Sequence, residues 1–138
     1  MFFNKKKENN HETGFIKIGA LLIHAAKIDE NYSLEEENII KKTLLDLGAN
    51  KNKLENLITK AKQFEQDANQ ILDFTKEIKN LEESDKIKII KSLWKIIFSN
   101  KDADIYETNL MRRLAGLLYI DSKIMGDIKE EIKKENLK

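Results

Sequence analysis

A short loop between two helices occurs twice in this chain, and this repeat restricts the possible fold more than any other sequence feature. Ser33 and Glu36 in the first copy correspond to Asp104 and Glu107 in the second, 71 positions later. Ser or Asp followed three residues on by Glu is the spacing of a helix-capping box. An apolar segment precedes each copy and an amphipathic segment follows it, so each loop is expected to join two helices.

Apolar residues at helical spacing predict further helices on both sides of these loops. The same offset of 71 pairs Leu22 with Leu93 and Leu57 with Ile128. The expected helices span residues 14–28, 51–65 and 69–81, and four more begin at Ser33, Ser84, Asp104 and Asp121 or Ser122. The sequence therefore predicts an all-α, single-domain bundle of about seven helices, built from pseudo-duplicated three-helix units that the fourth helix joins. The first and fifth helices are apolar around most of their surface, so we expect them to be the most buried.

The composition agrees with a helical protein and excludes several functions. The 138 residues include no Pro and only five Gly, and 41% of the residues are hydrophobic. The absence of Cys excludes disulfides, thiol nucleophiles and Cys-based zinc sites. The formal net charge is +1, with no marked excess of either sign in either half, which argues against general nucleic-acid binding.

The N-terminal residues differ from the rest of the chain. Residues 1–13 are polar apart from Phe2 and Phe3, and we expect a flexible tail followed by a helical domain over residues 14–138. The two Phe residues beside three Lys could contact the inner membrane peripherally or could dock on the domain. No signal peptide is evident, and the longest apolar segment, residues 18–26, is shorter than the roughly 20 residues that span a bilayer. We therefore expect a cytoplasmic location.

The acidic residues of the two loops form a candidate site for a divalent cation such as Ca²⁺ or Mg²⁺. Hard cations prefer oxygen ligands, and the candidate ligands are Asp29, Glu36, Asp104 and Glu107. Neither loop has the glycine or the terminal glutamate of an EF-hand. Helix capping by Ser33 with Glu36, and by Asp104 with Glu107, explains the same spacing without a metal. Capping is the interpretation that the spacing favours.

Enzymatic chemistry has little support in the sequence. There is no glycine-rich phosphate loop, and the two histidines, His11 and His24, form no recognisable Ser/His/Asp set. A single His at the edge of an apolar helix is expected to be a packed or partly exposed side chain. We therefore expect no enzymatic activity and no catalytic residues.

The first loop, residues 26–36, and the helix after the second loop, residues 106–118, resemble the TerB-like family. This family includes the tellurite-resistance protein TerB and the N-terminal domain of a membrane-anchored DnaJ-like cochaperone. Its pattern is similar to A-x-x-D-G-x-x-S-x-x-E, which residues 26–36 match except that Glu30 replaces the glycine. Residues 106–118, with the sequence YETNLMRRLAGLL, are similar to a short bacterial branch of the family. The resemblance covers residues 15–133.

The resemblance implies an all-helical fold, no established enzymatic activity and an association with stress responses at the inner face of the membrane. It also implies acidic residues suspected of binding a metal ion. In the second copy Asn100 and Lys101 replace the family's Asp and Gly, which puts a second metal site in doubt. Two functions remain open: a non-enzymatic module that binds other proteins in a stress response of the tellurite-resistance type, and a divalent-metal-binding or metal-sensing protein.

Overall fold

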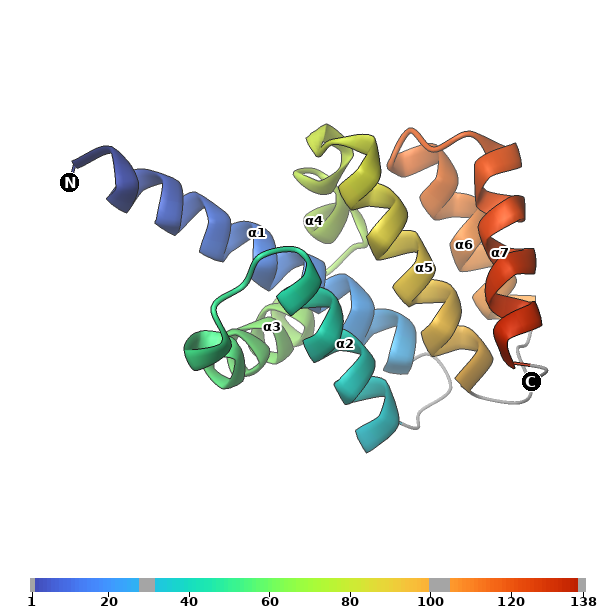
Figure 1. The fold of residues 1–138 in the computed structure, drawn as a ribbon, viewed down its shortest axis with the longest axis horizontal. Helices are drawn as coiled ribbons and strands as arrows, with labels where there is room; N and C mark the ends of the chain where they lie inside the picture. Colours follow the sequence, from blue (N-terminus) through green and yellow to red (C-terminus); the bar gives the residue numbers. More distant parts are fainter. Residues whose placement is uncertain (1, 28–31, 100–104, 137–138) are drawn as a thin grey trace.

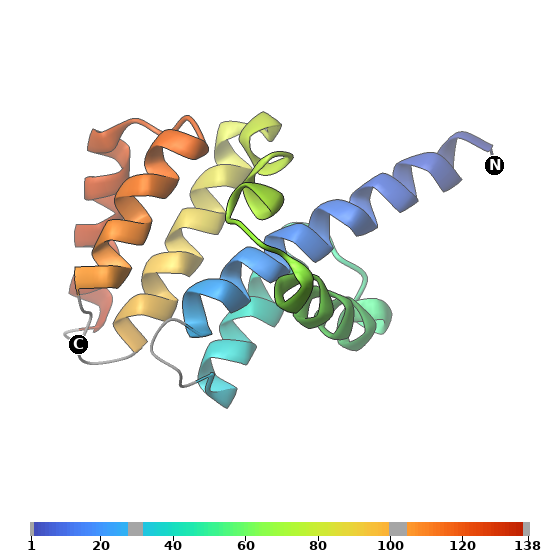
Figure 2. The same cartoon turned by 180° about the vertical axis from the view of Figure 1, so that it is seen from behind.

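The computed structural model describes residues 2–27, 32–99 and 105–136, and it describes side chains from residues 12–27, 32–99 and 109–135. The described chain contains helices and no strand. Figures 1 and 2 show the helices as one all-α bundle from which the start of the first helix projects. The elements in chain order are α1 (Phe2–Lys27), α2 (Leu34–Asp46), η1 (Lys51–Lys53), α3 (Leu54–Asp67), α4 (Leu72–Thr75), η2 (Ile78–Asn80), α5 (Glu83–Ser99), α6 (Ile105–Leu117) and α7 (Ser122–Asn136). The predicted fold class is confirmed.

Helices α1 and α5 form the centre of the bundle, as their apolar character predicts. α1 packs against α3, α2, α4 and α5, and α5 packs against α7, α2 and α1. Leu22 in α1 and Leu93 in α5 have no exposed surface. Gly19 allows α1 to approach α3 closely, because a Cβ atom at this position would lie 3.0 Å from the Cβ of Ala61. Among the side chains that the structure describes, these two helices are the most buried, as predicted.

The internal duplication is present in the backbone as well as in the sequence. Helix α2 spans residues 34–46 and α6 spans residues 105–117, so their bounds differ by the same 71 positions at both ends. Each helix then ends in the same way. Gly48 and Tyr119, again 71 positions apart, have positive φ angles of 107° and 57°.

The hydrogen bonds at these two helix ends also correspond. The Gly48 and Ala49 N–H groups donate to the carbonyls of Leu45 and Leu44. The Tyr119 and Ile120 N–H groups donate to the carbonyls of Gly116 and Ala115, which are the corresponding positions in the second unit. This pair of bonds is the Schellman arrangement, in which a residue of left-handed conformation closes the helix.

The predicted fourth helix is not a continuous α-helix, and that prediction is wrong. The segment contains a four-residue α-helix, α4, followed by the short 3₁₀ helix η2. Ile71, Lys76 and Glu77 keep right-handed helical φ and ψ angles, but some N–H groups of the segment donate to the carbonyl three residues earlier and others to the carbonyl four residues earlier. Phe74 and Ile78 are buried, and α4 packs on both α1 and α6. The apolar residues of this segment are thus buried against two different helices without forming one continuous α-helix.

The first helix begins at Phe2 rather than at Gly14, so residues 2–13 are helical and the expected loose tail is not observed over them. This segment lacks Pro and is rich in Lys and Glu, which favour helix. Lys60 in α3 forms an ion pair with Glu12 at 2.6 Å, which ties the end of this segment to the bundle. The boundary between a tail and a domain at residue 13 stays a prediction. None of the described helices combines the length and the apolar character needed to cross a membrane.

Candidate functional site

The first predicted loop contains the expected capping box at the start of α2. The Ser33 N–H donates to Glu36 Oε1 at 2.9 Å, and the Glu36 N–H donates to Ser33 Oγ at 3.1 Å. The Glu36 side chain is buried, with 4% of the residue exposed. These two hydrogen bonds satisfy N–H groups that the first turn of a helix leaves without partners. The capping interpretation of Ser33 and Glu36 is confirmed.

The neighbouring Glu37, which also belongs to the acidic sequence of this loop, is neutralised by lysines. Lys62 Nζ lies 2.9 Å from Glu37 Oε1 and Lys41 Nζ lies 3.7 Å from Glu37 Oε2. The Tyr32 hydroxyl donates to Glu37 Oε1 at 3.3 Å. The hydrogen bond from Lys62 lowers the pKa of Glu37, and the charges of Lys62 and Lys41 lower it further, although partial burial opposes them. Burial, followed by the charge of Glu37, raises the pKa of Tyr32.

The remaining predicted metal ligands are not placed by the structure. Asp29 and Asp104 lie outside the described residues, and the Glu107 side chain lies outside the described side chains. Among the residues that are described, no group of three or more His, Asp or Glu side chains is arranged to hold a metal ion. A cation at the first loop would have to share the Glu36 carboxylate with the Ser33 N–H group. The metal site stays a prediction.

His24 lies at the edge of α1 as a packed, partly exposed side chain, as expected. Its Nδ1 atom is 3.4 Å from Glu65 Oε1, and its ring centroid is 5.5 Å from that of Phe74. Lys27 forms an ion pair with the same Glu65 at 2.9 Å. His24 therefore belongs to a contact between α1, α3 and α4.

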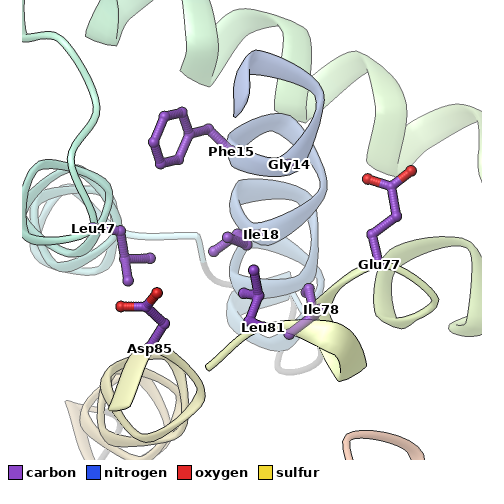
Figure 3. A pocket seen from close by; sticks show the side chains of 8 residues that line it. All are labelled: Gly14, Phe15, Ile18, Leu47, Glu77, Ile78, Leu81 and Asp85. Carbon is purple, nitrogen blue, oxygen red and sulfur yellow. The ribbon is translucent and has the colours of Figure 1, made fainter. Parts of the chain in front are cut away.

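A hollow of about 430 Å³ opens between α1, the end of α2, η2 and the start of α5 (Figure 3). We call it the acidic hollow, and its lining consists of Gly14, Phe15, Ile18, Leu47, Glu77, Ile78, Leu81 and Asp85. Figure 3 shows the Asp85 carboxylate directed toward Leu47, with Ile18 and Leu81 beside it. Its lining is therefore apolar apart from Gly14 and the two carboxylates.

A second depression, of about 830 Å³, lies between the end of α3, α4 and the end of α6. We call it the lysine-rimmed groove. Its apolar lining includes Phe64, Leu72, Leu117 and Tyr119, and its cationic lining comprises Lys17, Lys76 and Lys79. Two of the four exposed large apolar side chains in the described part of the chain, Leu72 and Tyr119, lie here.

One ion pair joins the margins of the two depressions. Lys17 lines the lysine-rimmed groove and Glu77 lines the acidic hollow. The Lys17 Nζ atom donates to Glu77 Oε1 at 2.6 Å. Because this pair neutralises one charge on each side, Asp85 is the remaining carboxylate of the hollow and Lys76 and Lys79 are the remaining cations of the groove.

Neither depression was predicted from the sequence, since each combines residues from at least three elements. One signal could have pointed to the groove. The offset of 71 that relates the two units places Tyr119 at the position of Gly48, so a large aromatic residue stands where the first unit has a helix-ending glycine.

These features define a class of protein: an all-α module of two related three-helix units, with two surface depressions and no recognisable catalytic centre among the described residues. The family model described as "Tellurite resistance protein TerB" matches residues 15–130. The chain therefore belongs to the TerB family. No curated protein and no solved structure gives a significant match.

Proposed function

We propose that this TerB-family chain is a non-enzymatic module that binds partner proteins in a stress response of the tellurite-resistance type. The observation that carries the proposal is the acidic hollow. Ile18 and Ile78 are buried beneath it, and Phe15 and Leu81 remain partly exposed to solvent. An apolar concavity on rigid helices, with a carboxylate among its lining residues, is typical of a site that receives an anchor side chain of another protein.

The charges of the hollow indicate which partner fits it. Asp85 lies in the first turn of α5, and no described Lys or Arg forms an ion pair with it. Glu77 is neutralised by Lys17. A partner segment with an apolar side chain followed by Lys or Arg would place the apolar group against Leu81 and the cation beside Asp85. Such a charge pair would add specificity and orientation to the apolar contact.

Two glycines provide a matched test. Gly14 lines the hollow and Gly126 is an exposed position of α7, and a Cβ atom at either position would meet nothing within 4 Å. The Gly14→Met substitution fills the hollow, whereas Gly126→Met adds the same side chain elsewhere. Both should stabilise their helices by about 0.5–1 kcal/mol, because glycine disfavours helix.

The experiment is a quantitative pull-down from the source cells with the wild type and both variants, followed by growth of cells carrying each variant in tellurite. The proposal expects defined partner proteins that the wild type and Gly126→Met retain and that Gly14→Met loses at unchanged folding. It also expects reduced growth in tellurite with Gly14→Met alone. Equal recovery of the same partners with Gly14→Met would show that the hollow does not bind them, and a wild type that captures nothing above background would contradict the proposed function.

A further inference from the structure

The acidic hollow carries charge of one sign only. Its lining includes the carboxylates of Glu77 and Asp85 and contains neither Lys nor Arg. Lys17 already pairs with Glu77, whereas no described Lys or Arg forms an ion pair with Asp85. An occupant that fits this lining therefore combines an apolar group with a nearby cation.

The start of α1 carries this combination of residues. Phe2 and Phe3 are followed by three lysines at positions 5–7, and the first acidic residue is Glu8. This part of α1 is the helical segment that projects from the bundle in both views (Figures 1 and 2). Its sequence thus complements the hollow in both apolar character and charge.

The hollow of the same molecule is out of reach of this segment. Helix α1 is continuous from Phe2 to Lys27, and its residues Gly14, Phe15 and Ile18 line the hollow. Because a helix rises about 1.5 Å per residue, residue 3 lies roughly 18 Å from residue 15 along the same axis. A segment of one continuous helix does not turn back on that helix, so the start of α1 reaches a hollow only in a second copy of the chain.

Residue spacing places the start of α1 and the hollow on one side of the helix. Intervals of four, four, three and four residues, which keep to one side of an α-helix, connect Phe3, Lys7, His11, Gly14 and Ile18. Gly14 and Ile18 line the hollow, and they identify this side as the one that is open there. A helix of a second copy lying along this side therefore meets the hollow.

Helix α3 lies against a different side of α1. Glu12 forms an ion pair with Lys60 at 2.6 Å, and Gly19, seven residues later, lies against Ala61. Each residue of a helix is turned by about 100° from the one before it. Glu12 and Gly19 are therefore at least about 100° around the helix from Gly14 and from residue 18, and α3 leaves the side of the hollow free.

We propose, on the basis of the hollow as the anchor site of the proposed function, that two copies of this chain pair through the starts of their α1 helices. The two helices run in opposite directions, with residue 3 of one copy beside residue 15 of the other, so that each Phe3 enters the hollow of the other copy. Long side chains on a helix extend toward its N-terminus, which directs Lys7 toward Asp85 of the second copy. The contact is the same on both copies and closes as a two-fold dimer.

The test is sedimentation equilibrium of the full chain over a range of protein and salt concentrations. Phe3→Ala and Phe2→Ala form a matched pair, because Phe2 precedes Phe3 by one residue and lies outside the side that carries the hollow. Gly14→Met fills the hollow, and Gly126→Met adds the same side chain at an exposed position of α7. Lys7→Gln and Asp85→Asn, alone and combined, test the charge pair.

The expected result for the wild type is a reversible monomer–dimer equilibrium that weakens as salt is added. Phe3→Ala and Gly14→Met should each raise the Kd of the dimer by about tenfold or more, because each change removes two anchors per dimer. Phe2→Ala and Gly126→Met should leave the Kd within about twofold. Lys7→Gln and Asp85→Asn should each raise it about threefold, and the combination should cost no more than one of them alone.

Four results would overturn the dimer. They are a wild type that stays monomeric, a dimer that Gly14→Met leaves intact, equal weakening by Phe2→Ala and Phe3→Ala, and a monomer that instead binds vesicles of phosphatidylglycerol. The pull-down from cells separates this outcome from the proposed function. A monomeric wild type that still captures other proteins contradicts only the dimer, whereas a dimer that captures no other protein contradicts only the proposed function.

Discussion

The first unit, α1 to α3, and the second, α5 to α7, share the bounds and the end of their middle helix but present different chemistry. Phe15 and Lys86 are separated by the offset of 71, and each lies near the Leu residue that ends the following helix, Leu47 or Leu118. Phe15 leaves an apolar hollow open to solvent. Lys86 instead extends its ammonium group to the Leu118 carbonyl and supports an exposed aromatic ring. Duplicated units thus share their helix ends and cores, whereas function can diverge in the side chains around them.

The largest expected effect tests whether matched positions of the two units contribute equally to the hydrophobic core. Leu22→Ala and Leu93→Ala occupy matched positions with no exposed surface, so each should lower the free energy of unfolding by about 2–5 kcal/mol. Urea denaturation measures both. Leu34→Ala is the control, since Leu34 is 72% exposed and its loss should change stability by less than about 0.5 kcal/mol. A loss below about 1 kcal/mol at one position alone would show that the units contribute unequally to the core.

The next effect concerns the two capping glutamates. Glu36→Ala should lower the free energy of unfolding by about 0.5–2 kcal/mol, because it removes the acceptor of the Ser33 N–H group. Glu107→Ala should have the same effect if Asp104 and Glu107 form a capping box in the second loop. Glu36→Gln keeps a capping oxygen but removes the charge that a cation needs. Thermal melts with and without millimolar Ca²⁺ or Mg²⁺ separate the two roles, since a ligand at 100 times its Kd stabilises by about 2.7 kcal/mol. If no cation raises the wild-type melting temperature, the predicted site at Asp29, Glu36, Asp104 and Glu107 is wrong.

A smaller effect of opposite sign is expected at the two helix ends. Gly48→Ala places a side chain at a φ of 107° and should lower stability by about 1 kcal/mol. Tyr119→Gly relieves the matched position and should raise stability by up to about 1 kcal/mol. Differential scanning calorimetry of both variants tests the comparison directly. A stability loss with Tyr119→Gly would mean that the contacts of the ring with Lys79 and Lys86 outweigh the backbone strain.

The smallest effect is a pH dependence confined to the first unit. The pKa of Glu37 is lower in the folded chain than in the unfolded chain, chiefly because Lys62 donates to its carboxylate. Glu37 therefore stabilises the fold above the unfolded pKa, about 4.3, and this contribution disappears as the pH falls through the folded pKa. Glu37→Gln should remove about 0.2–1 kcal/mol at pH 7 and flatten the decline of stability between pH 5 and pH 3, measured by urea denaturation. Glu135→Gln, an exposed control, should leave that decline unchanged.

Local signals in the sequence predicted most of the fold. Helical periodicity and capping residues located six of the seven helices, and Ser33 with Glu36 behaved as their spacing predicted. Periodicity failed at residues 69–81, where the buried Phe74 and Ile78 follow a helical spacing but pack on two helices at once. It also missed the helical state of residues 2–13, because a mostly polar segment gives no apolar periodicity from which to predict a helix.

The candidate site was much less predictable, for a physical reason. The acidic hollow and the lysine-rimmed groove are each lined by residues of several elements. Tertiary packing brings these elements together, and local residue patterns do not predict that packing. Asp85 and Leu47 are far apart in the chain and carry no common motif, yet both line one hollow. Only Tyr119 left a trace in the sequence, through its position opposite Gly48 in the duplication.

The packing of α4 has a consequence for the valency of the molecule. Helix α2 of the first unit packs directly on α5 of the second unit. Helix α4, which has no counterpart in the duplication, contacts both α1 of the first unit and α6 of the second. The molecule is therefore not a symmetric pair of interchangeable halves, even though its helices repeat. A symmetric protein would offer two copies of one surface and would link identical partners. This chain instead carries two unlike depressions, the acidic hollow on one side of the Lys17–Glu77 pair and the lysine-rimmed groove on the other, so each surface is present once in the molecule.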